Sequence, residues 1–154
     1  MTVSLVDSHC HIPMIEDDAV ESILSAAKAN DVIHMLCVSV DLETFPDVLN
    51  LAKKYDCTIV LKGEEDIICD SKECVVNTTG NEGMTKGGTG DVLAGLVAGL
   101  YCNNEAFLAA SAGVYINGLA GDRLYKKVGS YFNASDLMNE IPKVMALHSQ
   151  GKTS

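Results

Sequence analysis

The chain has 154 residues, 47% of them hydrophobic, and a formal net charge of −10. This length suits one ordinary domain with a buried core. The acidic balance excludes a general nucleic-acid-binding surface, because phosphate backbones are bound by clusters of Lys and Arg. The apolar runs are short and interrupted, so no signal peptide or membrane span is predicted. We therefore expect a protein of cytoplasmic type that binds neither nucleic acid nor membrane.

Six cysteines lie at positions 10, 37, 57, 69, 74 and 102, and no CxxC motif occurs among them. Several are within apolar runs such as HMLCVSV and DIICD. A free cysteine behaves as a small hydrophobic residue and is often buried. The pattern therefore predicts buried, reduced thiols in a reducing compartment rather than disulfides.

The first sixty residues predict alternating strands and helices. Short β-branched runs predict strands near 3–8, 32–38 and 57–61. Between them, residues 16–30 and 42–55 carry apolar side chains at helical spacing. The expected inner faces hold Val20, Ile23, Leu24 and Ala27 in the first helix and Phe45, Val48, Leu49 and Ala52 in the second. The order β-α-β-α-β predicts a parallel sheet covered by helices.

The pattern changes after residue 62. Residues 66–77 predict a β-hairpin with its polar tip at residues 70–73, and the following loop, 78–90, holds five of the thirteen glycines. Helices are predicted at residues 91–103, 105–129 and 133–148, the last with Ser135 as its N-cap, and a flexible tail at 149–154. The predicted fold class is α/β, a three-layer domain over residues 1–148 whose mostly parallel sheet includes an antiparallel hairpin.

The sequence GGTGD at residues 87–91 predicts a phosphate-binding cradle. Gly87, Gly88 and Gly90 allow backbone angles that let peptide N–H groups converge on an anion. The helix that begins at Thr89 or Asp91 directs its positive end at the same place. Asp91 has two interpretations, either an acid that caps the helix or a base that takes a proton from a hydroxyl attacking phosphate. The motif alone does not decide between them.

Three segments surround and include this motif, in the order VLKGEEDII, NTTGNEGMTKGGTGDVLAGLVAGL and AGVYINGLAGD. Their order and spacing closely resemble the C-terminal half of the ADP/ATP-dependent NAD(P)H-hydrate dehydratases, members of the ribokinase-like superfamily. The resemblance runs from about Leu51 to Met145. It implies an enzyme that uses ADP or ATP to phosphorylate the hydroxyl of a hydrated nicotinamide cofactor, after which phosphate leaves to restore NADH or NADPH.

The resemblance also implies roles for individual residues. Gly87, Gly88, Thr89 and Gly90 would form the anion hole, Asp91 would be the base, Lys62 and Gly63 would lie near the nucleotide, and the Asn77–Met84 loop, with Asn81, would line the adenosine and phosphate pocket. Many relatives have His where this chain has Asn117. The family's N-terminal half, which supplies central strands and much of the hydrate pocket, is replaced here by another sequence. We therefore expect ADP or ATP with Mg²⁺ to bind weakly.

The sequence that stands in place of the family's N-terminal half contains SLVDSHCHIPMI. In this stretch His9 and His11 are two residues apart at the end of an expected strand. Side chains at this spacing point to one face of a strand, so both imidazoles could reach one metal. The alternative interpretation is that they are simply two polar residues at a strand end. Residues 3–55 closely resemble the first segment of the TatD-family metal-dependent deoxyribonucleases, which are TIM barrels. That resemblance implies that His9 and His11 are metal ligands.

The remaining ligands of that family, a Glu, two His and an Asp, have no counterparts here. His34 lies in an expected core strand and His148 near the tail. Two imidazoles alone would hold a divalent metal weakly, because a hydrolytic centre needs three or more protein ligands and a bound water. We therefore predict no metal-dependent nuclease activity.

Together the two resemblances predict an artificial chimera, with residues 1–55 from a TatD-like segment and 56–148 from a dehydratase-like segment. The expected function is phosphate or nucleotide binding at residues 80–91, without a complete active site. One alternative is NAD(P)H-hydrate dehydratase activity rebuilt in an oligomer, and another is a TatD-like nuclease. The expected partners are a small anion or a nucleotide, and a second copy joined through leftover strand edges or exchanged segments.

Overall fold

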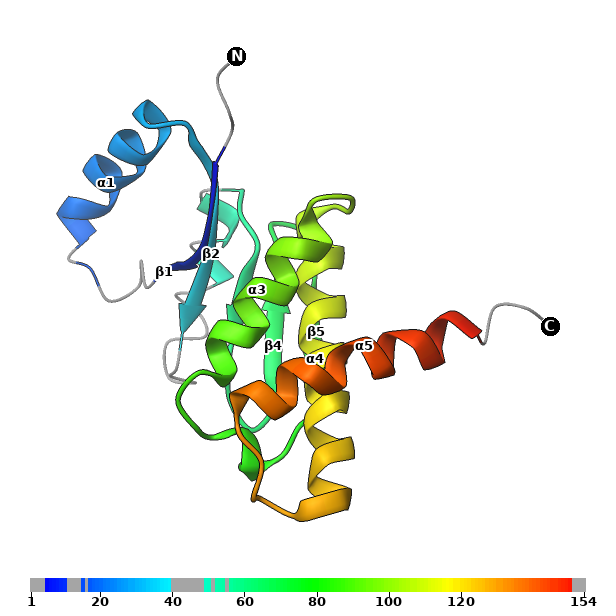
Figure 1. The fold of residues 1–154 in the computed structure, drawn as a ribbon. Coiled ribbons are helices and arrows are strands. Elements are labelled where there is room, and N and C mark those ends of the chain that lie inside the picture. The colour runs from blue at the N-terminus through cyan, green and yellow to red at the C-terminus, as the bar shows by residue number, and fades with distance from the viewer. Residues whose placement is uncertain are drawn as a thin grey trace. The chain divides into compact units, whose positions relative to one another are not determined.

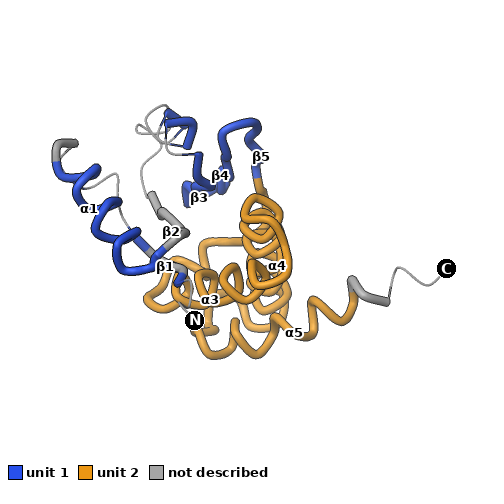
Figure 2. Tube along the Cα trace, turned by 90° about the horizontal axis from the view of Figure 1, so that it is seen from above, with its two compact units in different colours: residues 1–76 blue, residues 77–154 orange. Residues whose placement is uncertain are grey.

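The computed structural model describes residues 5–10, 15, 17–39, 49–50, 52–54 and 56–150 (Figure 1). The chain divides into two compact units, residues 1–76 and 77–154, which are coloured separately in Figure 2. The single domain expected over residues 1–148 therefore stays a prediction, as does its three-layer arrangement.

A five-stranded mixed sheet in the order β1-β2-β3-β4-β5 forms most of unit 1. Its strands are β1 (Leu5–Cys10), β2 (Val32–Ser39), β3 (Ile59–Leu61), β4 (Asp66–Cys69) and β5 (Cys74–Asn77). β1 pairs with β2 and β2 with β3 in parallel, whereas β3 and β4 are antiparallel. The predicted parallel strands and the predicted hairpin are thus confirmed.

Helix α1 (Asp17–Ala29) connects β1 to β2. The chain turns at Asp31, whose φ of 62° is left-handed and whose carbonyl accepts the Leu5 N–H at 2.8 Å. Residues 49–50 and 52–54 are also helical. One hydrophobic cluster of unit 1 consists of buried Val20, Ala52 and Ile59, with Cys10, Ile15, Ile23, Leu24, Met35 and Cys57 packed against it. The predicted inner faces are confirmed for Val20, Ile23, Leu24 and Ala52, while Phe45 and Val48 lie outside the described residues.

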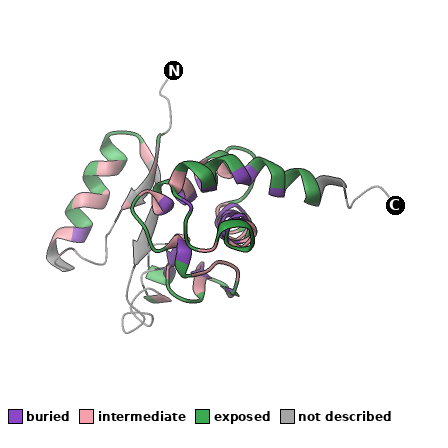
Figure 3. Cartoon of the chain, turned by 60° about the horizontal axis from the view of Figure 1, so that its bottom comes forward, coloured by how far each residue is buried: buried purple, intermediate pink, exposed green. Residues whose placement is uncertain are grey.

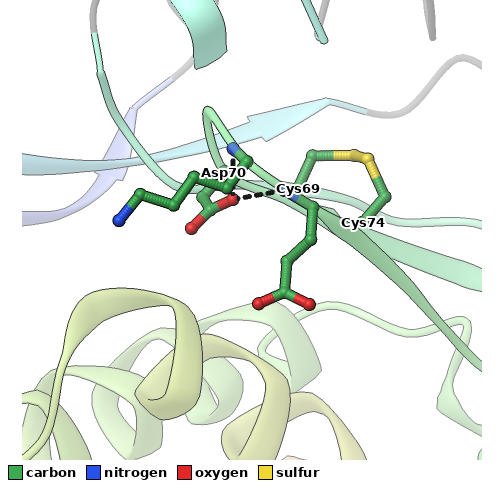
Figure 4. Close-up of a disulfide and its surroundings, with 5 residues drawn as sticks. Cys69, Asp70 and Cys74 are labelled. Atoms are coloured by element: carbon green, nitrogen blue, oxygen red, sulfur yellow. Dashed lines mark hydrogen bonds between the residues drawn. A yellow bond between two sulfur atoms is a disulfide. The ribbon is translucent and has the colours of Figure 1, made fainter.

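The tip of the β4–β5 hairpin is a tight turn closed by Asp70 (Figure 4). The Asp70 N–H donates to the Glu73 carbonyl at 2.9 Å, and Asp70 Oδ1 accepts the N–H groups of Lys72 and Glu73 at 2.7 Å each. The Glu73 N–H, followed by that of Lys72, lowers the pKa of Asp70. This turn sets the register, so that Cys69 and Cys74 face each other as the next cross-strand pair.

Cys69 and Cys74 form a disulfide, with their Cα atoms 4.1 Å apart. Facing residues in a non-hydrogen-bonded antiparallel pair have the shorter Cα separation, close to this value. The prediction of reduced cysteines is therefore wrong for this pair, because hairpin register places two apolar-run cysteines side by side. Cys10, Cys57 and Cys102 are free thiols, and burial raises the pKa of Cys57 to about 11.

Unit 2 consists of a short 3₁₀ helix and three α-helices. These are η3 (Glu82–Met84), α3 (Thr89–Tyr101), α4 (Ala106–Val128) and α5 (Ala134–Gln150). The three predicted helices are confirmed within two residues at each end. Residues 149 and 150, expected in the tail, are helical. Among the described helices, none is long and apolar enough to cross a membrane.

Asn133, rather than Ser135, is the N-cap of α5. Asn133 Oδ1 accepts the N–H groups of Ser135 at 2.8 Å and Asp136 at 3.1 Å, and Asp136 Oδ2 accepts the Asn133 N–H at 2.9 Å. This reciprocal arrangement is a capping box. The predicted cap was wrong by two positions, because Asn and Ser are both good caps and the sequence NAS offers either.

Small residues on α4 let other segments approach its backbone closely. A Cβ built on Gly113 would lie 2.5 Å from Val97 Cγ2 of α3, and one on Gly121 would lie 2.2 Å from Met84 Sδ.

The buried residues of the described part of the chain are purple in Figure 3. One hydrophobic cluster of unit 2 consists of buried Ala120, Leu124, Phe132, Leu137, Ile141 and Val144, with Met84, Val92, Leu96, Ile116 and Leu119 packed against it. This packing holds the loop before α3 against α4.

Candidate anion-binding site

The GGTGD motif forms the N-terminus of α3. Gly88 is the N-cap, with φ 88° and ψ −17°, a left-handed conformation that glycine adopts without a Cβ penalty. The Val92 N–H donates to the Gly88 carbonyl at 3.1 Å and starts the helical hydrogen bonds. The structure thus brings Gly87, Gly88, Thr89, Gly90 and Asp91 together at the positive end of a 13-residue helix.

Backbone N–H groups at this helix start are available to a ligand. The Thr89 N–H donates to the Lys86 carbonyl over a long 3.4 Å. Within residues 56–150, no acceptor is found for the N–H groups of Gly87, Gly88, Gly90 and Asp91. Unpaired N–H groups at a helix N-terminus, aligned with the helix dipole, favour a bound anion. The start of α3 therefore presents unpaired donors, and anion binding by them stays a prediction.

Thr89 links the preceding loop to the helix. Its side chain is buried, and its hydroxyl oxygen lies 2.8 Å from the carbonyl oxygens of both Met84 and Lys86. The single hydroxyl hydrogen can be donated to either carbonyl. Because the hydroxyl is used in this way, Thr89 contributes to the cradle by holding its backbone in place.

Asp122 of α4 holds the 80–83 turn. Its Oδ2 accepts the Gly80 N–H at 3.2 Å, and its Oδ1 accepts Asn81 Nδ2–H at 2.9 Å. Asn81 Oδ1 in turn accepts the Gly83 N–H at 3.0 Å and caps η3. The Asn81 side chain, predicted to line the nucleotide pocket, is thus engaged within the protein. Asp122 was given no role from the sequence, because nothing in the local pattern connects it with residues about forty positions earlier.

Asn77 and Thr79 hold the start of the same loop. Asn77 Nδ2 donates to the Thr79 carbonyl at 3.1 Å, and Thr79 Oγ1 lies 2.8 Å from Asn77 Oδ1 and 3.2 Å from the Tyr115 carbonyl of α4. A Cβ on Gly118 would lie 2.1 Å from Thr79 Oγ1. Both ends of the Asn77–Met84 loop are therefore fixed on α4.

Lys86 closes the cradle loop on the segment before α5. Its Nζ donates to the carbonyls of Phe132, at 2.7 Å, and Ser130, and it lies 4.8 Å from the centre of the Phe132 ring. A Cβ on Gly88 would lie 3.0 Å from the Cβ of Ala134, the first residue of α5. The ammonium group of Lys86 thus acts as a structural tether beside the cradle.

Asp91 is exposed in the first turn of α3. Within residues 56–150, its carboxylate makes no hydrogen bond or ion pair. The capping bond that one interpretation requires is therefore not formed, and the carboxylate is free to contact a ligand. Its role as a base stays a prediction.

The other predicted site residues lie in unit 1. Lys62 and Gly63 follow β3, and the Gly63 N–H donates to Asp66 Oδ1 at 3.2 Å. The backbone of His9 belongs to β1, whereas His11 lies outside the described residues. In the described part of the chain, no three His, Cys, Asp or Glu side chains are grouped as a metal site. Weak metal binding at the two histidines stays a prediction.

The net negative charge of the chain comes from one unit. Residues 1–76 contain five Lys and Arg against fifteen Asp and Glu, whereas residues 77–154 contain six against six. The whole net charge of −10 thus belongs to unit 1. The unit with the cradle is neutral, so its own net charge does not oppose an anion.

The models of two known families match this chain. The model of the NAD(P)H-hydrate dehydratase family matches residues 41–143, about two thirds of the chain. This chain belongs to the NAD(P)H-hydrate dehydratase family. A second model, of TatD related DNases, matches residues 6–62, somewhat more than a third of the chain. Both resemblances read from the sequence are therefore found, and their ranges overlap at residues 41–62.

Curated relatives of this family are similar over the same part of the chain. The bifunctional NAD(P)H-hydrate repair enzyme of Methanocaldococcus jannaschii is 54% identical over 90 residues, which are 58% of this chain and 18% of that protein. The ADP-dependent (S)-NAD(P)H-hydrate dehydratase of Cenarchaeum symbiosum is 43% identical over 99 residues, which are 64% of this chain and 34% of that protein. The chain therefore spans about a fifth to a third of the length of these relatives.

Solved structures are similar in fold. The ADP/ATP-dependent NAD(P)H-hydrate dehydratase of Bacillus subtilis, co-crystallized with ATP/Mg²⁺, matches with a TM-score of 0.61 and 26% identity over 73% of this chain and 48% of that one. A ribokinase-like superfamily protein of Enterococcus faecalis matches with a TM-score of 0.65 and 27% identity over 74% of this chain and 44% of that one. The fold is thus α/β and ribokinase-like.

Proposed function

We propose that this chain acts as an ADP/ATP-dependent NAD(P)H-hydrate dehydratase, with its phosphate cradle at residues 87–91. One observation carries the proposal. Unpaired N–H groups of Gly90 and Asp91 lie at the positive end of α3, next to a carboxylate that is not engaged by the protein. Membership of the NAD(P)H-hydrate dehydratase family supports a role for these donors and this carboxylate in phosphoryl transfer from a nucleotide.

The backbone and the side chains of the cradle would have different roles in the reaction. The backbone N–H groups would bind oxygens of the phosphoryl group, where developing negative charge is stabilised by donors already in position. The hydroxyl oxygen of the hydrate would attack the terminal phosphorus of ADP or ATP, the bond from that phosphorus to the bridging oxygen would break, and AMP or ADP would leave. The Asp91 carboxylate would take the hydroxyl proton in this step. Asp122, Lys86 and Thr89 would keep the cradle in place, because each bonds the loop to a helix or to the segment before one.

ADP or ATP with Mg²⁺ is the proposed co-substrate and supplies the phosphoryl group. The unpaired amides fit an anionic phosphate, and the B. subtilis relative was co-crystallized with ATP/Mg²⁺. The Asn77–Met84 loop is proposed to contact the nucleotide, and a nucleotide contact of Lys62 and Gly63 stays a prediction. Because Asn81 already bonds Asp122 and Gly83, its contribution would be to shape the pocket.

A second candidate function is anion or nucleotide binding without turnover. The match of residues 6–62 to the TatD related DNase model favours it, because a chimera of two family segments would lack part of the hydrate pocket. Turnover would then require a second copy of the chain to supply the missing part, so homo-oligomer formation belongs to the dehydratase proposal.

One experiment separates the candidates. Purified protein is assayed for conversion of NADH hydrate to NADH with ADP or ATP and Mg²⁺, and ADP binding is measured by calorimetry. We expect Asp91→Asn to abolish turnover and to retain ADP binding, since it removes the base and leaves the amides. Glu105→Gln is the matched control, because it neutralises an exposed acid at the start of the neighbouring helix α4.

The outcomes differ clearly. Turnover that Asp91→Asn removes and Glu105→Gln retains supports the dehydratase. ADP binding without turnover in the parent chain supports the second candidate. Turnover that survives Asp91→Asn would refute the role of this base, and ADP binding that survives Gly88→Val would place the nucleotide elsewhere.

A further inference from the structure

A buried carboxylate at the seam between α4 and α5 is covered by three cations. The Glu140 side chain of α5 is 2% exposed. Its Oε1 accepts Arg123 Nε–H at 2.9 Å and Lys127 Nζ–H at 2.8 Å, and its Oε2 accepts Lys143 Nζ–H at 2.8 Å. The three cations come from both helices and remain 39%, 50% and 60% exposed. A ligand approaching from solvent therefore meets their positive groups before the carboxylate.

The cluster carries more positive charge than the buried acid requires. Three cations around one carboxylate leave two positive charges uncompensated among these four groups. Hydrogen bonds from Lys127, then from Lys143, lower the pKa of Glu140 to about 2 against the opposing effect of burial, so the acid stays ionised. Lys126, which is exposed on the same turn of α4, adds another cation nearby.

Among the described residues, Glu140 is the acid that pairs with these three cations. Asp136, one turn earlier on α5, forms no ion pair with them within 4 Å, and its Oδ2 accepts the Asn133 N–H of the helix cap. The C-terminal end of α4 has a partial negative charge, which explains why cations gather there but is smaller than the excess of two. Half of the six cations of unit 2 belong to this cluster, within a chain of net charge −10.

We propose that Arg123, Lys127 and Lys143 form a second anion site, for a phosphate-type dianion, on the α4–α5 seam. The N–H groups of these side chains that are not directed at Glu140 supply the donors, and a dianion matches the excess of two charges. Arg and Lys are the side chains that recognise phosphate groups in proteins. The bond to Glu140 holds the three long side chains in one place, which reduces the conformational entropy that binding would otherwise cost.

This site does not depend on the proposed dehydratase function. It uses no residue of the GGTGD motif, and Glu140 needs no nucleotide to hold the cations. The ligand chemistry is a phosphate dianion, either free or carried by a small molecule. The test therefore compares inorganic phosphate with AMP, and uses adenosine as the uncharged reference.

The experiment titrates the full isotope-labelled chain with inorganic phosphate at constant ionic strength set by sodium chloride. NMR signals of the lysine side chains and of the amides near residues 123, 127 and 143 are followed. We expect saturable shifts with a dissociation constant on the order of 1 mM, weakened about tenfold in Lys127→Gln. Lys126→Gln is the matched control, since it removes the same charge from the adjacent position and is outside the cluster.

The amides of residues 87–91, followed in the same titration, provide the second control, because they report phosphate at the cradle separately from the seam and require no substitution beside α5. Seam shifts that saturate independently of the cradle amides and weaken in Lys127→Gln support the second site. Lys143→Gln gives an independent variant if Lys127→Gln does not fold, since either leaves two cations on Glu140. Shifts with AMP as well as phosphate extend the site to phosphate esters, whereas shifts with phosphate alone restrict it to the free ion.

Three results would overturn the inference. One is the absence of saturable seam shifts with both phosphate and AMP. Another is equal weakening in Lys126→Gln and Lys127→Gln, which would show only diffuse attraction to positive surface. The third is a set of seam shifts that follow the same binding curve as the cradle amides and are not weakened in Lys127→Gln, which would assign all phosphate binding to the cradle.

Discussion

Replacing Gly88 by alanine tests whether the cradle depends on a left-handed glycine. Gly88 has φ 88°, and an added Cβ would lie 3.0 Å from the Ala134 Cβ at the start of α5. Carbon atoms prefer separations of about 3.5–4.0 Å, so one of the two segments must shift by several tenths of an ångström. The substitution therefore strains the backbone and pushes α5 away from the cradle.

The expected loss in the free energy of unfolding follows from the left-handed backbone and the close contact. A left-handed conformation costs an L-residue about 1–2 kcal/mol relative to glycine. The close contact adds to this cost, so we expect Gly88→Ala to lower the free energy of unfolding by about 2 kcal/mol. Gly87→Ala is the matched control, because a Cβ there meets nothing within 4 Å and its φ is not positive. We expect the control to stay within about 0.5 kcal/mol of the parent.

Urea unfolding measures the free energies, and phosphate or ADP titration measures the cradle. Gly88→Ala should weaken anion binding, because the N–H groups at the helix start lose their arrangement, whereas Gly87→Ala should retain it. Equal stability and equal affinity in the two variants would refute the reasoning. That result would show that neither the left-handed backbone nor the contact with α5 matters for the cradle.

Gly118→Ala should lower the free energy of unfolding, measured by urea titration, by about 1–3 kcal/mol, because its Cβ would overlap Thr79 in the loop held on α4. Gly95→Ala should raise the same free energy by about 0.5–1 kcal/mol, because its Cβ meets nothing within 4 Å and alanine is the better helix residue. The depressed pKa of Glu140, about 2 against an ordinary 4.5, means that its stabilising effect is complete above pH 4.5 and is lost as pH falls toward 2. Acid titration of unfolding should therefore be shallower over this range in Glu140→Gln. Cys74→Ser should lower stability by about 2 kcal/mol through loss of the hairpin disulfide, as measured by unfolding without reductant.

A specific result would contradict each of these predictions. Gly118→Ala and Gly95→Ala with the same sign would show that contact with the loop does not limit position 118. An acid profile unchanged by Glu140→Gln would show that the three cations do not hold this carboxylate ionised. A reductant that destabilises Cys74→Ser as much as the parent chain would show that the measured effect does not come from the disulfide.

The sequence by itself determined the elements and the cradle. The strands, the helices and the GGTGD turn are encoded in a few consecutive residues, because side-chain periodicity and glycine backbone freedom act locally. The segments that resemble the two families were also readable from the sequence, since each motif is continuous. Even so, the local pattern misplaced the cap of α5, where Asn133 and Ser135 offered equally good chemistry.

Only the tertiary structure decided what supports the cradle. Asp122 bonds residues more than forty positions away, and Lys86 bonds Phe132 at a similar separation. The Cys69–Cys74 bond depended on hairpin register, and the cations on Glu140 depended on which faces of α4 and α5 meet. These contacts join segments that are distant in the chain or paired only after folding, so their partners are chosen by packing geometry, which no local pattern of residues encodes.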